Sequence, residues 1–140
     1  MESKVTWKDG MAFDAELDGH HFTIDATDKV GGRDLGPRPK GLTVTSLIGC
    51  TGMDVISILN KMKQPVKSFD VTGQAVMAEE HPVSFKKINV IYRAEGEIEE
   101  AKLKRAVQLS EERYCGVSET LRPAVELTSE IWLNGTQLSG

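Results

Sequence analysis

The feature that most constrains the fold of this chain is a long apolar segment between residues 40 and 62. Its apolar side chains occupy most of the circumference of a helix: Leu42, Leu47, Ile48, Val55, Ile56, Ile58, Leu59 and Met62. A helix that is apolar on several sides must be buried on several sides. We therefore predict a core helix from about Lys40 to Met62, which Pro65 ends.

Patterns typical of strands lie on both sides of this helix. Residues 5–26 alternate apolar and polar side chains, and Asp9-Gly10 and Asp18-Gly19 interrupt the alternation, which predicts three antiparallel strands. Similar alternation predicts strands over 69–75, 88–92 and 125–133, and a helical stripe predicts an amphipathic helix over 98–114. Glycine and proline make 28–39 a loop. The order indicates an α+β fold with antiparallel sheets around the long helix.

The length of 140 residues is that of one domain, which we expect to cover 1–140. A small sheet leaves part of such an apolar helix uncovered. We therefore predict an obligate homodimer in which two of these helices pack together and strands of both chains wrap around them.

The charge balance disfavours two classes of partner. The chain has 17 basic and 21 acidic side chains, a net charge of −4, so it offers no general attraction to nucleic acid or to an anionic membrane. The longest apolar runs are shorter than the ~20 residues of a membrane helix, and the start at residues 1–4 is polar. We expect a cytosolic protein with no nucleic-acid or membrane partner.

The two cysteines, Cys50 and Cys115, are the candidates for chemistry. In a reducing compartment they are better explained as free or catalytic thiols than as a structural disulfide. A thiolate that attacks a peroxide becomes a sulfenic acid, which a second thiol converts to a disulfide. The alternative is that Cys50 is a small buried apolar residue. Spacing alone does not decide between them.

The residues around Cys50 suggest a close approach by another group. Gly49 and Gly52 each cost roughly 1 kcal/mol relative to alanine inside a helix, so we expect another backbone, a substrate or a tight packing contact at this point. With Met53 they are our candidates for lining a substrate pocket.

Four short segments resemble the OsmC/Ohr family, in particular its OsmC-like branch: GPRP at 36–39, GCTGMDVISIL at 49–59, EHP at 80–82 and ERYCGVSETL at 112–121. The resemblance implies an OsmC-like fold, an intertwined homodimer with sites at the subunit interface, and thiol-dependent reduction of organic hydroperoxides. It implies that Cys50 is the peroxidatic and Cys115 the resolving cysteine. It also implies reduction by a dithiol, such as a lipoylated protein, and no cofactor.

Two positions depart from the family pattern that activates the thiol. Active members usually carry a glutamate shortly after the proline that precedes the cysteine helix, where this chain has Gly41 and its neighbours, and an arginine in the N-terminal strands, where it has Ala12. Candidates for stabilising the thiolate instead are Arg38, Lys40 and Arg33. The alternative is that these three are solvated loop charges.

Other motifs carry little chemistry. His20, His21 and His81 are too few and too scattered for a metal site of standard spacing, so no metal is predicted. Two functions therefore stay open. The first is an organic hydroperoxide reductase, and the second is a binding protein that holds a small hydrophobic or thiol ligand without turnover.

Overall fold

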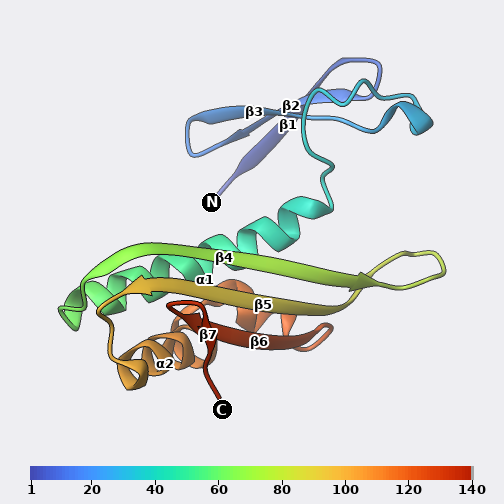
Figure 1. The fold of residues 1–140 in the computed structure, drawn as a ribbon. Coiled ribbons are helices and arrows are strands. Elements are labelled where there is room, and N and C mark those ends of the chain that lie inside the picture. Colours follow the sequence, from blue (N-terminus) through green and yellow to red (C-terminus); the bar gives the residue numbers. More distant parts are fainter. Residues whose placement is uncertain (140) are drawn as a thin grey trace. The chain divides into compact units, whose positions relative to one another are not determined.

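The computed structural model describes residues 1–139. The chain forms two compact units, Met1–Thr43 and Val44–Gly140, and each is described by itself below (Figure 1). The expectation of one domain over 1–140 stays a prediction.

The N-terminal unit is a three-stranded antiparallel sheet. Its strands β1 (Ser3–Asp9), β2 (Ala12–Leu17) and β3 (His20–Ile24) pair in the order β1-β2-β3, and a short helix η1 (Asp28–Val30) follows. Both connections use positive φ angles, at Gly10 in the first turn and at Asp18 and Gly19 in the second. Such angles suit Asp-Gly hairpins, so the three predicted strands are confirmed.

The predicted core helix is confirmed as α1 (Gly41–Lys61). Its buried residues recur at every fourth position and form one stripe: Leu47, Thr51, Val55 and Leu59. By length and composition α1 could also cross a bilayer, contrary to the estimate from the longest apolar runs. The core helix of a globular protein passes the same test, so the cytosolic location stays a prediction.

The second sheet has the order β4-β5-β6-β7 and belongs to the C-terminal unit. Its strands are β4 (Val66–Met77), β5 (Phe85–Gly96), β6 (Glu126–Leu133) and β7 (Thr136–Gln137), the last of which the sequence pattern did not predict. The pairing of β5 with β6 is parallel, which corrects the expectation of purely antiparallel sheets. The cause is a helical crossover of α2 (Glu100–Leu109), η2 (Ser110–Tyr114) and α3 (Gly116–Leu121), since parallel neighbours need such a connection.

A glycine of β4 lets α1 pack closely against the sheet. A Cβ at Gly73 would lie 2.5 Å from Val44 Cγ1 and 3.1 Å from Ile48 Cγ2. The same construction at Gly49 meets nothing within 4 Å, and at Gly52 only Val71 Cγ2 at 3.4 Å. The predicted close approach therefore involves the glycine of the strand and not Gly49.

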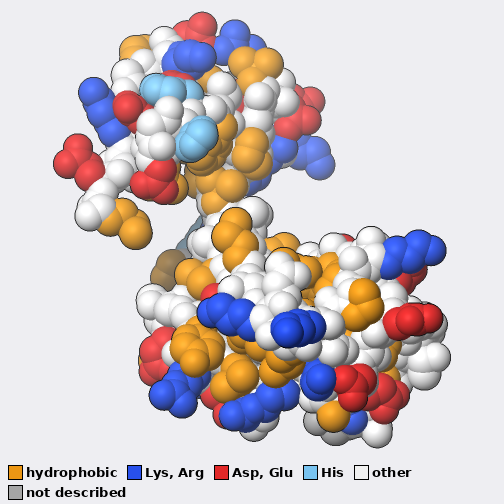
Figure 2. Space-filling view, turned by 90° about the vertical axis from the view of Figure 1, so that its left-hand side faces the viewer, with side chains coloured by type: hydrophobic (Ala, Val, Ile, Leu, Met, Phe, Trp, Pro, Cys, Tyr) orange, Lys and Arg blue, Asp and Glu red, His pale blue; other side chains and the backbone are white. Residues whose placement is uncertain are grey.

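The core of the C-terminal unit lies between α1, the crossover helices and the sheet. Among its most buried side chains are Val55, Leu59, Ile88, Tyr92 and Leu103, each at most 1% exposed. Figure 2 shows hydrophobic side chains at the surface of both units. The large exposed ones include Trp7, Met11, Phe22, Leu35, Met53 and Tyr114. The α+β fold is confirmed, and the homodimer that would cover such side chains stays a prediction.

Candidate active site

The fold brings Cys50 and Cys115 together inside the C-terminal unit. Cys50 lies in the middle of α1, and Cys115 stands between η2 and α3 on the crossover. Their sulfur atoms and a carboxylate oxygen of Asp54 all lie within 4.8 Å of one another. Both cysteines are free thiols; Cys115 is 3% exposed and Cys50 is half-buried. The prediction that the two thiols are neighbours is confirmed.

The start of α3 supplies hydrogen bonds to both sulfurs. Cys115 is the N-cap residue of this helix, and its Sγ accepts a hydrogen bond from the Ser118 main-chain N–H, with an N–S distance of 3.4 Å. The Val117 amide donates to the Cys50 thiol. Cys115 reaches this position because η2 is a π-helical turn and Cys115 itself is extended. Such π turns widen the helix by one residue and are frequent at functional sites.

The Cys50 thiol is not activated by the groups recorded around it. Burial raises its pKa above the ordinary value, and the hydrogen bond to Cys115 and the negative charge of Asp54 raise it further. Only the Val117 amide acts in the opposite direction. The thiol is therefore predominantly protonated at neutral pH, which slows attack on a peroxide.

A chain of buried hydroxyl groups leads from Asp54 into the core. The Ser110 hydroxyl donates to Asp54 Oδ2 at 2.9 Å, and Thr51 Oγ1 lies 2.7 Å from Ser110 Oγ and 2.8 Å from the Tyr92 hydroxyl. Thr51, Ser110 and Tyr92 are at most 1% exposed. The sequence analysis did not predict this row of hydrogen-bonded hydroxyl groups. The available signal was the pair Thr51 and Asp54, one and four positions after Cys50 on the same helix.

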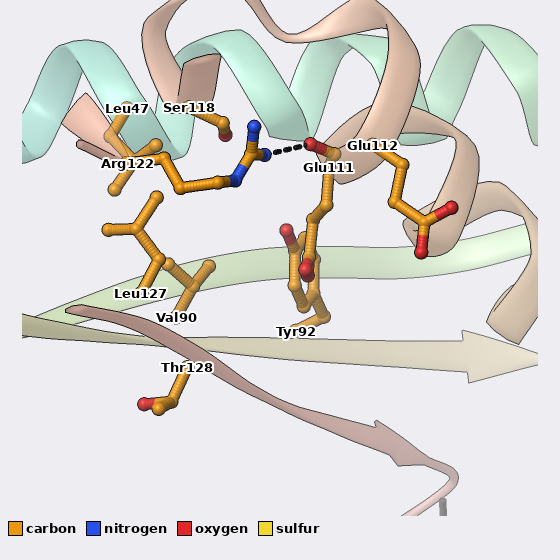
Figure 3. Close-up of a pocket in the computed structure, with 9 residues that line it drawn as sticks. All are labelled: Leu47, Val90, Tyr92, Glu111, Glu112, Ser118, Arg122, Leu127 and Thr128. Atoms are coloured by element: carbon orange, nitrogen blue, oxygen red, sulfur yellow. Dashed lines mark hydrogen bonds between the residues drawn. The ribbon is translucent and has the colours of Figure 1, made fainter. Parts of the chain in front are cut away.

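Tyr92, the last of these hydroxyl-bearing residues, also lines a cavity of about 260 Å³ (Figure 3). Apolar walls come from Leu47, Val90 and Leu127, and polar groups from Tyr92, Ser118, Thr128, Glu111, Glu112 and Arg122. The Arg122 guanidinium donates to the main-chain oxygen of Glu111, not to its carboxyl. Among the described residues, Glu111 Oε1 is buried without a hydrogen-bond partner, and burial raises the pKa of this carboxyl.

The predicted pocket residues lie together in a different place. Gly49, Gly52 and Met53 line an open groove of about 640 Å³ between α1 and β4, opposite Phe69 and Val71. Met53 is 77% exposed there. The residues recorded along the groove do not include either cysteine. A substrate role for these three residues stays a prediction.

The predicted thiolate-stabilising residues belong to the N-terminal unit. Arg33 is ion-paired with Asp9, and Arg38 with Asp34. Lys40 immediately precedes α1. Their action on Cys50 stays a prediction.

The two positions that depart from the family pattern are also in this unit. Ala12 is 1% exposed, and Gly41 is the first residue of α1. Neither side chain can supply the charge that the family pattern places there.

Comparison with known proteins places the chain in a family. The sequence profile of the OsmC-like proteins matches residues 31–130. The chain is 34% identical to Protein YhfA of Escherichia coli K12 over 130 residues, which are 91% of this chain and 94% of that protein. The chain belongs to the OsmC-like family.

Solved structures share the fold. A hypothetical protein from Aquifex aeolicus superposes with a TM-score of 0.81 at 28% identity, over 95% of this chain and 96% of that one. An organic hydroperoxide resistance protein OsmC from Legionella pneumophila superposes with a TM-score of 0.67 at 17% identity, over 94% and 95% of the two chains. At that identity the second likeness concerns the fold alone.

Proposed function

We propose that this chain is a thiol-dependent peroxidase that reduces organic, lipid-like hydroperoxides. The observation that carries the proposal is the position of Cys50 and Cys115, whose sulfurs lie within 4.8 Å of each other. Membership of the OsmC-like family supports it, as does the fold shared with a hydroperoxide resistance protein. The apolar surroundings of the thiols favour a lipid-like hydroperoxide over hydrogen peroxide.

The proposed reaction has three balanced steps. The thiolate of Cys50 attacks the distal oxygen of ROOH, the O–O bond breaks, and RO⁻ leaves as the alcohol after taking up a proton. The Cys115 thiol then attacks the Cys50 sulfenic acid, which forms the disulfide and releases water. A dithiol reductant, such as a lipoylated protein, returns both thiols and is itself oxidised to a disulfide. Cys50 is assigned to the first step because Cys115 is the more buried thiol.

The test is consumption of cumene hydroperoxide by the reduced protein with dithiothreitol as the dithiol. Wild type should turn over, and Cys50→Ser should not. Cys115→Ser should react once and accumulate a sulfenic acid that dimedone traps. Equal consumption by wild type and Cys50→Ser would reject the proposal.

The pH dependence follows from the pKa of Cys50, which burial raises above the ordinary thiol value. Because only the thiolate attacks, the rate of the first step should keep rising with pH past the ordinary thiol pKa of about 8.5. A rate that is already constant at pH 7 would show that another group of the assembled protein activates this thiol.

A second function, ligand binding without turnover, is favoured by one specific observation. The groups recorded around Cys50 raise its pKa, and the positions of the usual activating pair hold Ala12 and Gly41. In this case Cys50→Ser should bind a small hydrophobic or thiol ligand as tightly as wild type, and neither protein should consume hydroperoxide. Loss of binding in that conservative variant would count against this function.

A further inference from the structure

A carboxylate lies beside the two thiols, and two thiols with one carboxylate are side-chain types that bind metal ions. Cys50 and Asp54 are four residues apart on α1 and so lie on the same face of the helix, and Cys115 approaches from the start of α3. Their three ligand atoms lie within 4.8 Å of one another. Zn–S bonds near 2.3 Å and Zn–O bonds near 2.1 Å place ligand atoms roughly 3.5–3.8 Å apart in a tetrahedral site. The upper limit of 4.8 Å on the observed separations is about 1 Å longer than that spacing.

The carboxylate is oriented by groups behind it. Ser110 donates to Asp54 Oδ2 at 2.9 Å and is in turn held by Thr51, which also contacts the Tyr92 hydroxyl. A carboxylate has two oxygens, so one can accept from Ser110 while the other binds an ion. Hydrogen bonds of this kind, from groups that do not touch the metal, fix the direction of metal ligands.

The negative charge of the Asp54 carboxylate is not neutralised by an ion pair within the described part of the C-terminal unit. Among residues 44–139, no lysine or arginine is ion-paired with Asp54, whose recorded side-chain partner is the Ser110 hydroxyl. Two thiolates and a carboxylate would carry three negative charges, which a divalent cation would largely neutralise. Three protein ligands also leave a fourth position open, as in catalytic zinc sites.

Solvent can reach this position from one side. An open depression of about 540 Å³ is lined by Asp54 together with Lys61, Leu109 and Tyr114. An ion can therefore approach the carboxylate without opening of the core, and an entry path is one requirement for a metal site.

We infer that Cys50, Asp54 and Cys115 of the reduced protein bind one divalent cation that accepts sulfur ligands, with Zn²⁺ as the representative ion. Binding releases the two thiol protons to solvent, and both sulfurs become ligands. The histidines gave no such prediction because none of them belongs to this cluster.

Oxidation should expel the ion, a step that rests on the proposed function. Two thiolate ligands, one hydroperoxide and two protons give the disulfide, the free cation, the alcohol and water. The disulfide has lost both thiolate ligands. Metal and hydroperoxide therefore compete for the same reduced thiols.

The test uses Co²⁺ as a spectroscopic probe of the reduced, metal-free protein without oxygen. One Co²⁺ per chain should bind and give a thiolate-to-cobalt charge-transfer band, and Zn²⁺ should abolish it. Cys50→Ser and Cys115→Ser should each weaken that band, and Asp54→Asn should lower the Co²⁺ affinity at least tenfold. Asp70→Asn, an exposed aspartate on β4, is the matched control and should bind like wild type.

Absence of a charge-transfer band, or a band that survives both cysteine substitutions, would overturn the inference. An Asp54→Asn variant that binds Co²⁺ as tightly as wild type would remove Asp54 from the site. Protein oxidised with diamide, which forms disulfides without a hydroperoxide, should bind no Co²⁺. A protein that binds Co²⁺ yet never consumes hydroperoxide would reject the peroxidase while leaving the metal site intact.

Discussion

Two faces of α1 differ sharply in their surroundings. One face carries Thr51, Val55 and Leu59, each at most 1% exposed and packed within its own chain. The other carries Gly49, Gly52 and Met53 along an open groove. On the first face, even the polar side chain of Thr51 has hydrogen-bond partners on two sides.

The chain completes the contacts of the buried face by itself. Burying a hydroxyl is costly unless it is hydrogen-bonded, and the chain satisfies that condition at Thr51 and Ser110. The groove face, with the exposed Met53, stays open in a single chain. Substitutions on the two faces should therefore behave differently.

The largest expected effect is that of Leu59→Ala. This side chain is fully buried, so its loss should lower the free energy of unfolding by about 2–5 kcal/mol. Met53→Ala on the open face should change it by less than about 0.5 kcal/mol. Urea unfolding of both variants measures the contrast. A large, concentration-dependent loss in Met53→Ala would mean that a second copy covers the groove.

A smaller loss is expected from Thr51→Val, which keeps the shape of the side chain and removes its hydroxyl. The hydroxyls of Tyr92 and Ser110 each lose a buried partner, so we expect a cost of about 1–3 kcal/mol. Thr72→Val, an exposed position on β4, is the control. Unfolding midpoints that coincide for the two variants would show that the hydroxyl chain contributes nothing to stability.

Replacing either of two glycines by alanine should change the stability of the protein, in opposite directions for the two positions. Gly73→Ala places a Cβ against Val44 and Ile48 and should destabilise the protein by about 1–3 kcal/mol. Gly49→Ala meets nothing within 4 Å and should stabilise it by up to about 1 kcal/mol through helix propensity. Thermal unfolding measures both. A destabilised Gly49→Ala would indicate that another chain packs on this glycine.

The smallest expected effect concerns the cavity. Burial raises the pKa of Glu111 in the folded protein, so the native state binds more protons than the unfolded state above the ordinary carboxyl pKa. Its contribution to stability is therefore fully present at low pH and is lost as pH rises through the folded pKa. Glu111→Gln should reduce this loss, and Glu112→Gln, an exposed neighbour, should not. Unfolding free energies measured from pH 4 to pH 8 should separate the two variants.

Much of the fold could be predicted because the spacing of apolar residues along the sequence indicates the helices and strands. The density of apolar residues between 40 and 62 locates α1 within one residue at each end. The parallel pairing of β5 with β6 could not be predicted in this way, because alternation along a strand does not specify the direction of its neighbour. The two-residue strand β7 is too short to show a period.

The candidate site was predictable only in part. The resemblance to a family paired Cys50 with Cys115, whereas their spacing in the sequence did not. Asp54 escaped attention because its meaning depends on Cys115 and Ser110, which are more than fifty positions away and arrive through the crossover. A cluster assembled from two distant stretches of sequence, 50–54 and 110–115, leaves no local pattern.

The proposed function requires that the sulfurs of Cys50 and Cys115 can bond to each other. Its most direct test is the intact mass of the reduced protein after one equivalent of cumene hydroperoxide, with free thiols alkylated before measurement. We expect a loss of two hydrogens, no alkylation, and a single peptide that links Cys50 to Cys115. A gain of one or more oxygens, with Cys115 still alkylated, would contradict it.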